Sequence, residues 1–236
     1  MTMIIDVSYH QGVIDWSKVG KEIDYAILRC GYGSNSKEND DKKFYYNATK
    51  CEKYGIPYGV YLYSYAKTKQ NIIGEVTHII RLIKDRKVKY PIYLDMEETS
   101  IAKTGVYEEL AKVFVSMIRA TGRKAGLYSG DYIFGKYLKN VDCDSKWVAR
   151  YSYNVPNTDY DIWQYTSQGY VNGIIGNVDC NKGKDKLIFS DYFYDCIVND
   201  VLDGKYGNGQ KRKEALFDKG INYMKVQHLV NVLYSM

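Results

Sequence analysis

Short apolar runs alternate with helix-like stretches along the first 182 residues of the chain. The runs are rich in Val, Ile, Leu and Tyr, as is typical of strands, and they cover residues 3–8, 25–31, 57–66, 90–97, 124–130, 146–152, 161–166 and 178–181. Apolar residues at helical spacing predict helices between the early runs, over residues 41–54, 70–85, 105–121 and 131–139. Strands that alternate with helices in this way indicate parallel βαβ units.

The helical pattern fades after residue 139, and the last predicted strands follow one another directly. Eight strands with about five helices predict an α/β fold, an irregular TIM-like (β/α)5β3 barrel, which we place at residues 1–182. Active sites of such barrels lie at the C-terminal ends of the strands. Polar side chains at those ends are therefore the candidates for chemistry.

The composition changes after Gly183. A segment rich in Gly, Lys and Asp predicts a linker at residues 183–190, and short apolar patterns separated by glycine-containing turns predict a small three-helix bundle at residues 191–236. A bundle of this size has only a marginal core of its own. We therefore expect it to pack on the barrel or on a second copy of itself.

The composition is that of an ordinary folded chain, with 45% hydrophobic and 26% charged residues. No apolar stretch approaches the ~18 residues of a membrane span, and the first residues lack the basic start of a secretory signal. The net charge of +5 is spread along the chain, which argues against a nucleic-acid footprint. We expect neither a membrane nor a nucleic acid among its partners.

Cysteine and histidine are few and scattered. Five cysteines without a C-x-x-C pair argue against a disulfide framework and a zinc site, and three scattered histidines argue against a histidine-based metal site. We expect no metal and no cofactor. Tyrosine is abundant instead, at 26 residues, and its flat face with a polar tip suits the binding of polar rings, although a codon bias would produce the same surplus.

The most informative polar pair is Asp95 and Glu97. Residues two apart on a strand face the same side, so both carboxylates point one way while Leu94 and Met96 pack on the other. Two aligned like charges raise at least one pKa, which suits a general acid with a supporting carboxylate, as glycoside hydrolysis requires. The alternative is an exposed acidic strand end that runs into a loop.

Two more carboxylates are expected at the same rim. Asp6 ends the first predicted strand and Asp179 lies in the eighth, which adjoins the first if the barrel closes. Four carboxylates that converge on one rim are electrostatically costly, and such a cost indicates a functional site. Taken singly, Asp6 could cap the following turn and Asp179 could be a turn residue.

The order of these motifs resembles the Chalaropsis-type lysozymes, glycoside hydrolase family 25, over residues 1–182. The resemblance is carried by Asp6-Val-Ser-Tyr-His-Gln11-Gly12, Tyr58-Gly-Val-Tyr61-Leu-Tyr63-Ser-Tyr65, Asp95-Met-Glu97, Gly126-Leu-Tyr128-Ser129, Trp163-Gln164-Tyr165 and Val178-Asp179. It implies an N-acetylmuramidase that cleaves the β-1,4 bond from N-acetylmuramic acid to N-acetylglucosamine in bacterial peptidoglycan. A non-catalytic glycan-binding protein on the same scaffold is the alternative.

The resemblance also implies a role for each carboxylate. Glu97 becomes the general acid that protonates the leaving oxygen. Asp95 or Asp179 orients the acetamido group of the substrate or stabilises positive charge, and Asp6 completes the network.

Further substrate contacts are expected from side chains at the strand ends, namely Tyr61, Tyr63, Tyr128, Trp163, Gln164 and Arg29. The aromatic members would act as platforms for sugar rings, although tyrosines on parallel strands can equally be barrel filling. The segment that starts at Arg29 departs from the pattern of many relatives, so the grip on the glycan can differ.

The tail resembles the CW-seven cell-wall-binding repeat, of which it carries a single copy. The matching residues are Val201-Leu-Asp-Gly204-Lys-Tyr-Gly207-Asn208-Gly209-Gln-Lys-Arg212-Lys, Gly220-Ile-Asn-Tyr223 and Val226-Gln227 with Val230-Asn231. The resemblance implies binding to peptidoglycan, with Gly207, Asn208, Gly209 and Arg212 as contacts, although the glycines could be helix stops. A single repeat would gain avidity from a second copy, so a homo-oligomer through the repeat is a further expectation.

Without a secretory signal, an enzyme of this kind must leave the cytoplasm by another route. A phage endolysin, made in the host cytoplasm and released onto the bacterial cell wall, fits this requirement better than a bacterial autolysin. We therefore expect a peptidoglycan hydrolase that serves host lysis.

Overall fold

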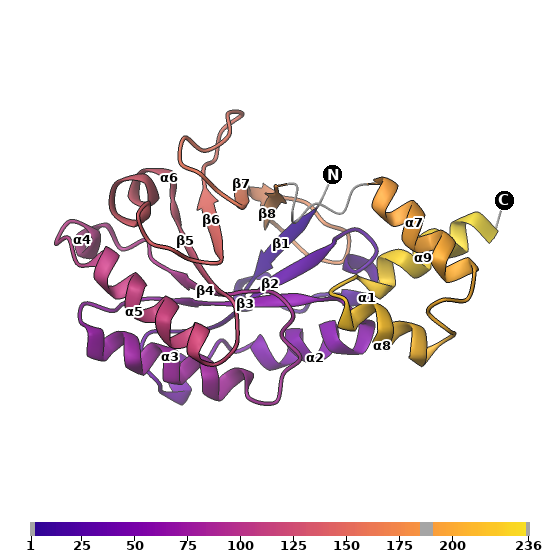
Figure 1. The fold of residues 1–236 in the computed structure, drawn as a ribbon, viewed down its shortest axis with the longest axis horizontal. Coiled ribbons are helices and arrows are strands. Elements are labelled where there is room, and N and C mark those ends of the chain that lie inside the picture. The colour runs from indigo at the N-terminus through magenta and orange to yellow at the C-terminus, as the bar shows by residue number, and fades with distance from the viewer. Residues whose placement is uncertain (1–2, 185–190, 235–236) are drawn as a thin grey trace.

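The structure of the chain, a computed structural model, describes residues 3–184 and 191–234. Its strands close into a barrel in sequence order, so that β8 pairs with β1 (Figure 1). The first seven strands run parallel, and β8 is antiparallel to both of its neighbours. The strands are β1 Ile4–Val7, β2 Tyr25–Tyr32, β3 Tyr58–Tyr63, β4 Ile92–Asp95, β5 Ala125–Gly130, β6 Ser145–Ala149, β7 Ile162–Gly169 and β8 Val178–Gly183. The predicted α/β barrel is confirmed.

Helices cover only part of this barrel. The long helices α2 (Phe44–Tyr54) and α3 (Lys69–Ile83) pack on β2, and α5 (Tyr107–Ala120) packs on β4 and β5 (Figure 1). Between β5 and β6 the chain forms only α6 (Asp131–Ile133) and a π-helical turn (Phe134–Leu138), and loops join β6, β7 and β8. The helices thin out where the helical spacing of apolar residues fades in the sequence. The remaining short elements are the 3-10 turns Tyr9–Gln11 and Lys37–Asn39, and the helices α1 Trp16–Val19 and α4 Thr99–Ala102.

Side-chain alternation along the strands separates two apolar layers. Outward residues such as Ile5, Leu28 and Leu94 join the layer beneath the helices. Inward residues fill the barrel, mostly with aromatic rings, namely Ile4, Tyr25, Ile27, Tyr93, Tyr128, Trp147 and Ile162. Toward the C-terminal ends of the strands the inward-facing side chains become polar. On β1, for example, Asp6 follows the inward residue Ile4 by two positions and so faces the same side. The alternation that fills the barrel therefore also places carboxylates at its mouth.

The C-terminal helices form a small bundle of their own. The helices α7 (Asp191–Leu202), α8 (Gln210–Asp218) and α9 (Tyr223–Tyr234) enclose an apolar core that includes Leu216 and Val226. The predicted helical tail is thus confirmed. The predicted linker at residues 183–190 lies mostly outside the described residues, and its boundaries stay predictions. None of the described helices is long and apolar enough to cross a membrane.

The bundle packs on the end of the barrel where the strands begin, away from their C-terminal ends. Asn222 is fully buried there, and its amide donates to two backbone carbonyl oxygens in the loop before β2, at 3.0 and 2.8 Å. Asp24, fully buried just before β2, accepts hydrogen bonds from the Tyr194 hydroxyl at 2.5 Å and from the Lys225 ammonium at 2.7 Å. Of the two arrangements expected for so small a core, the chain adopts the one in which the bundle leans on its own barrel.

Candidate active site

A pocket of about 500 Å³ opens at the C-terminal ends of the strands. It brings together all four predicted carboxylates, Asp6 on β1, Asp95 at the end of β4, Glu97 and Asp179 on β8. Glu97 lies beyond the last residue of β4, yet it lines the same pocket as Asp95, while Leu94 and Met96 are buried in the outer apolar layer. The expected division of this segment into an acidic side and an apolar side is therefore confirmed.

Asp6 and Asp179 are paired residues in the antiparallel register of β1 and β8. Burial and the facing carboxylate of Asp179 raise the pKa of Asp6 far above its ordinary value. Burial also raises the pKa of Asp179. Two carboxyl groups so placed retain a proton at a pH where isolated carboxyl groups are ionised.

A chain of hydrogen bonds fixes the orientation of Asp6. The Trp147 indole can only donate, and it donates to the amide oxygen of Asn181 at 2.7 Å, so the Asn181 NH2 group must be the part that meets Asp6 Oδ2, at 2.8 Å. Gln164 donates to the same oxygen at 2.9 Å, and its own amide oxygen accepts the Tyr128 hydroxyl at 2.8 Å. Because Oδ2 accepts two N–H groups, Oδ1 is the atom of Asp6 that is left to carry a proton.

Asp95 and Glu97 differ in exposure. Asp95 is 4% exposed, and its Oδ1 is buried without a hydrogen-bond partner among the described residues. Burial, Glu97 and Asp6 together raise the pKa of Asp95 well above its ordinary value. Glu97 is exposed, and its pKa is raised by partial burial, by Glu98 and by Asp179. Glu97 is therefore the most accessible carboxyl group of the four and still has a raised pKa.

Arg29 is the one Lys or Arg among the described residues that line the pocket. Its Nε donates to Asp41 at 2.8 Å, and its guanidinium carbon lies 4.9 Å from the ring centroid of Tyr9. The positive charge opposes the rise in the pKa of Asp95. Arg29 thus lies where it was predicted, as a cation held in place by a carboxylate outside the pocket.

Three predicted tyrosines, Tyr61, Tyr63 and Tyr128, line the pocket. Tyr61 and Tyr63 share the inward face of β3, and the Tyr63 hydroxyl donates to Glu98 at 2.7 Å. Tyr128 is only 7% exposed and belongs to the apolar filling of the barrel, while its hydroxyl supports Gln164. Tyr128 therefore both lines the pocket and fills the barrel, so the two roles considered for the tyrosines do not exclude each other at this position.

Trp163 does not line the pocket, contrary to expectation. Adjacent residues on a strand point to opposite sides, and Gln164 points inward to Asp6. Trp163 therefore points outward, where its indole donates to the Arg150 carbonyl oxygen at 2.8 Å and the Lys182 ammonium lies 5.6 Å from its ring centroid. The alternation rule alone therefore predicts that Trp163 and Gln164 cannot both face the pocket.

The sequence reasoning missed several residues of the pocket, namely Trp147, Tyr151, His10, Ser167 and Asn177, and also Asn181 behind it. Trp147 and Asn181 occupy inward positions of β6 and β8, so strict alternation could have found them. Tyr151 lies in the loop after β6, and its hydroxyl donates to Gln164 at 2.8 Å. No periodic sequence pattern predicts the direction of a side chain in a loop, so the place of Tyr151 in the pocket could not be predicted in this way.

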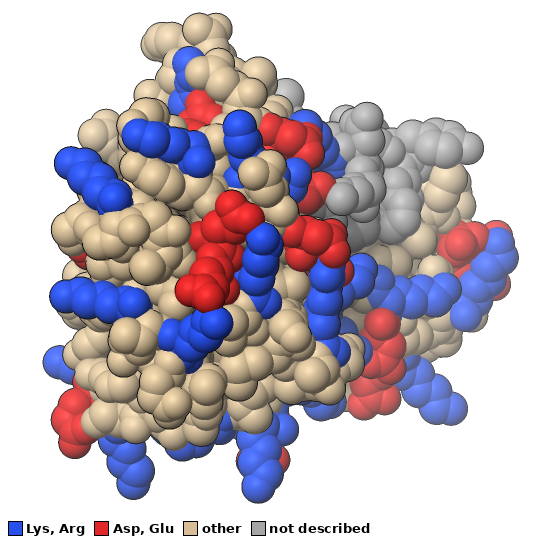
Figure 2. Space-filling model, turned by 60° about the vertical axis from the view of Figure 1, so that its left-hand side comes forward, with Lys and Arg blue, Asp and Glu red and all other residues tan. Residues whose placement is uncertain are grey.

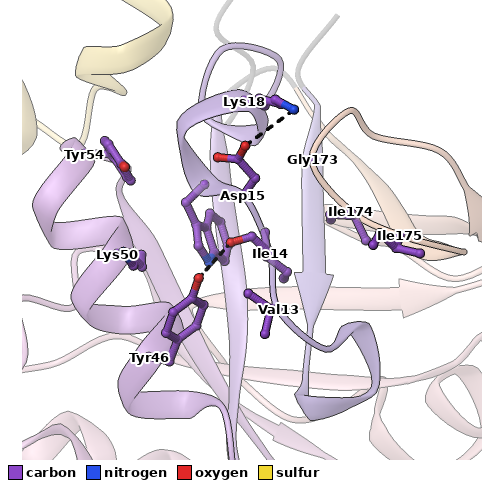
Figure 3. A pocket seen from close by; sticks show the side chains of 11 residues that line it. Val13, Ile14, Asp15, Lys18, Tyr46, Lys50, Tyr54, Gly173, Ile174 and Ile175 are labelled. Atoms are coloured by element: carbon purple, nitrogen blue, oxygen red, sulfur yellow. Dashed lines mark hydrogen bonds and ion pairs between the residues drawn. The ribbon is translucent and has the colours of Figure 1, made fainter.

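A second hollow, of about 450 Å³, lies on the flank of the barrel between α1 and α2 (Figure 3). Its walls are largely apolar, and the Tyr46 hydroxyl donates to the carbonyl oxygen of Ile14 at 3.1 Å. Its carboxylate, Asp15, is already bound by Ser17 and Lys18. Within the described part of the chain, Asp15 is the only carboxylate that lines the flank hollow, so an acid pair of the kind that glycoside hydrolysis requires is not found there.

The predicted wall contacts of the bundle lie together at the start of α8. Gly207 and Gly209 have φ angles of 65° and 55°, which favour glycine, so the turn itself requires both. The Arg212 guanidinium donates to the Gly207 carbonyl oxygen at 3.0 Å, to Gln227 at 2.9 Å and to Asn208 at 2.8 Å. Arg212 therefore holds this turn together, and Asn208 and Gly209 are the more exposed members of the set.

Charged side chains are mixed over the face in Figure 2, where Asp and Glu gather near the centre and Lys and Arg surround them. A nucleic acid is bound through a continuous basic track along its backbone. The face in Figure 2 offers no such track. In the described part of the chain, no group of three or more His, Cys, Asp or Glu side chains is arranged to hold a metal ion.

The mouth of the barrel holds an accessible carboxyl group with a raised pKa beside buried carboxylates. This arrangement is typical of glycoside hydrolases. Comparison with known proteins narrows this class. The profile described as Glycosyl hydrolases family 25 matches residues 5–174, and that of the CW_7 repeat matches residues 195–233. The chain belongs to glycosyl hydrolase family 25.

Three similar proteins illustrate the family. The catalytic domain of the endolysin ply40, from bacteriophage P40 of Listeria monocytogenes, is 28% identical with a TM-score of 0.73, over 79% of this chain and 95% of that one. The modular autolysin LytC from Streptococcus pneumoniae is 32% identical with a TM-score of 0.65, over 76% of this chain and 46% of that one. The autolytic lysozyme of Clostridium acetobutylicum is 23% identical over 188 residues, 78% of this chain and 56% of that protein. The chain is thus a glycoside hydrolase of a lysozyme family.

Proposed function

We propose that the chain is an N-acetylmuramidase that cleaves the β-1,4 bond between N-acetylmuramic acid and N-acetylglucosamine in bacterial peptidoglycan. The observation that carries the proposal is the convergence of Asp6, Asp95, Glu97 and Asp179 on one pocket. A general acid must hold a proton at the working pH and must reach the leaving oxygen. Glu97, exposed and with a raised pKa, meets both requirements.

The other three carboxyl groups prepare the reaction in this proposal. Asp95, whose Oδ1 lacks a partner among the described residues, or Asp179 accepts the N–H of the substrate's acetamido group. A hydrogen bond to a carboxylate favours its ionised form, so the bound substrate itself promotes a negative charge where positive charge develops on the sugar. Asp6, held by two amides, stands opposite its paired residue Asp179 and completes the carboxyl network.

Tyr61, Tyr63 and Tyr128 are the proposed contacts for the sugar rings, with Gln164 and Arg29 as polar contacts. A pyranose presents apolar C–H faces and polar edges, which match a tyrosine face and its hydroxyl. Arg29 adds a fixed positive charge next to Asp95. Trp163, which points away from the pocket, has no part in the proposal.

The bundle is proposed as the wall-binding part, and residues 1–182 as the catalytic part. The match of the CW_7 repeat supports this division, with Asn208 and Gly209 as contacts on a turn that Gly207 and Arg212 shape. Likeness to a phage endolysin supports a role in host lysis, with synthesis in the host cytoplasm and action on the wall after release. A non-catalytic glycan-binding protein is the weaker alternative, because binding alone gives no reason to bring four carboxylates together.

Mass spectrometry of the fragments released from purified cell walls tests the proposal. Borohydride reduction before digestion of the fragments marks the new reducing ends. Reducing ends on muramic acid are the expected result, and reducing ends on glucosamine contradict it. Intact binding to walls without any release would instead favour the non-catalytic alternative.

A further inference from the structure

Glu97 lies in a short stretch between the end of β4 and the start of α4. The sheet reaches only as far as the backbone N–H of Met96, which donates to the Tyr128 carbonyl oxygen at 2.9 Å. The described residues 96–98 belong to neither a helix nor a strand. Regular secondary structure therefore does not fix the direction of the Glu97 side chain, although a general acid works only when it is aimed at the leaving oxygen.

Two side-chain hydroxyl groups hold the backbone on either side of Glu97. The Ser129 hydroxyl, from β5, donates to the carbonyl oxygen of Met96 at 2.6 Å. The Tyr107 hydroxyl, from the first residue of α5, donates to the carbonyl oxygen of Glu98 at 2.9 Å. We propose that Ser129 and Tyr107 form a hydroxyl clamp, a pair of positioning residues that fix the direction of Glu97 for the reaction. The inference rests on the proposed function, because it takes Glu97 as the general acid.

Both members of the hydroxyl clamp are buried in the fold. Ser129 is 0% exposed and Tyr107 is 2% exposed. A buried hydroxyl without a partner costs free energy, so each donor favours the backbone position that accepts its proton. Neutral donors also place no positive charge beside the acid, which would lower the pKa of Glu97 and weaken its hold on the proton. The hydroxyl clamp therefore constrains the acid without discharging it.

The surroundings of Glu97 make its direction measurable. Partial burial and the negative charges of Glu98 and Asp179 all raise the pKa of Glu97. A side chain released from the clamp meets more water and spends less time near these charges, so each of these causes weakens. Loss of the clamp should therefore lower the pKa of Glu97. A general acid that loses its proton earlier also stops working at a lower pH.

Removal of each hydroxyl group tests the clamp. Ser129→Ala and Tyr107→Phe each delete one donor, and Tyr107→Phe keeps the ring that packs in the outer apolar layer. We expect kcat on a soluble wall glycan to fall about tenfold in each variant while KM stays within about twofold, because a misplacement of ~1 Å alone costs up to roughly 100-fold. The alkaline limb of the pH–activity profile is expected to move to lower pH.

Carboxyl-carbon NMR gives a readout that needs no substrate. The Glu97 signal is assigned by its loss in Glu97→Gln, and its titration is followed in the parent and in both clamp variants. We expect the midpoint of this titration to move to lower pH in Ser129→Ala and in Tyr107→Phe. A merely structural role would lower the folded fraction and with it the apparent rate at every pH alike, so it would move neither the limb nor the midpoint.

Two matched variants remove hydroxyl groups that hold other parts of the barrel. Ser145→Ala deletes a buried hydroxyl that bonds with the Tyr93 hydroxyl at 3.0 Å. Tyr46→Phe deletes a tyrosine hydroxyl that donates to the carbonyl oxygen of Ile14 at 3.1 Å. Both are expected to lose some stability, with the alkaline limb and the Glu97 midpoint as in the parent.

The outcomes separate the clamp from the function on which it rests. Parental kcat and an unmoved Glu97 midpoint in both clamp variants overturn the inference, and so does an equal change in the two matched variants. If the parent cleaves no glycan, the muramidase proposal fails, whereas a lowered midpoint in the clamp variants still supports the control of Glu97 by the two hydroxyl groups.

Discussion

Asp6 and Asp179 occupy paired positions on β1 and β8, the two strands that close the barrel. The closure therefore brings together two carboxylates from opposite ends of the catalytic part, 173 positions apart (179 − 6). Burial raises the pKa values of both, and the charge of Asp179 raises that of Asp6 further, although two amides donate to Asp6. The fold thus keeps a pair that destabilises it, which is expected where function and stability compete.

The cost of this pair should be visible in stability against pH. An unfolded Asp loses its proton near pH ~3.9, whereas the buried Asp6 retains it to a much higher pH. The native state therefore binds more protons between these values, and the free energy of unfolding falls as pH rises through that window, by about 1.4 kcal/mol per unit of raised pKa. Asn mimics the protonated acid, so Asp6→Asn should flatten the fall. Urea unfolding at pH 5 and pH 8 measures it.

The control for that measurement is Asp85→Asn, at an exposed residue in the turn after α3. It should leave the pH dependence of the parent unchanged. If Asp6→Asn instead shows the same fall between the two pH values as the parent, Asp6 is ionised in the native state and the shared proton is absent.

Loss of the proton donor should abolish most of the activity without loss of the fold. Glu97→Gln keeps the shape and removes the proton, so lysis of purified walls should fall by roughly 10²–10⁴-fold, the usual contribution of a general acid. Turbidity of a wall suspension measures the rate, and circular dichroism checks the fold. Glu109→Gln, on the exposed side of α5, should behave as the parent. Near-parental lysis by Glu97→Gln would remove Glu97 from the role of acid.

The neighbour Glu98 offers a finer test of the same role. Its negative charge raises the pKa of Glu97, after burial the largest cause, and its Oε1 accepts the Tyr63 hydroxyl at 2.7 Å. Glu98→Gln keeps an acceptor for that hydroxyl but removes the charge, so the pKa of Glu97 should fall. A general acid works while protonated, and the alkaline limb of the pH–activity profile should therefore move to lower pH. A limb that stays in place or moves upward would mean that another group sets it.

Much of the barrel and of its acid cluster follows from local rules. Period-two alternation separates Asp95 and Glu97 from Leu94 and Met96, and the rule that barrels work at the strand ends selects Asp6. These rules act within one strand, so a sequence reveals them. The same rule, applied to β7, would have excluded Trp163.

The rest depends on contacts between distant segments, which no local rule reveals. Tyr151 reaches the acid pocket from a loop because Asp131, on another element, ties down the segment around it. Arg212 suggests a ligand contact by its charge, and three of its five N–H donors also hold the bundle together, at Gly207, Asn208 and Gln227. In each case the partner that decides the role is visible only in three dimensions.

The contact between bundle and barrel should affect wall binding more than chemistry. Asn222 donates to two barrel carbonyl oxygens, and its own oxygen accepts the N–H groups of Met224 and Lys225 at the start of α9. Asn222→Ala leaves these groups without partners, which costs about 1–3 kcal/mol for each buried group.

The three tryptophans lie at positions 16, 147 and 163, in the barrel, so their fluorescence follows the barrel while far-UV circular dichroism follows both parts. We expect circular dichroism of Asn222→Ala to change at lower urea than fluorescence, and wall binding to weaken. Cleavage of soluble glycan should stay near parental, as it should for the exposed control His228→Ala. A proportional loss of soluble-glycan cleavage would show that the bundle supports the acid pocket itself.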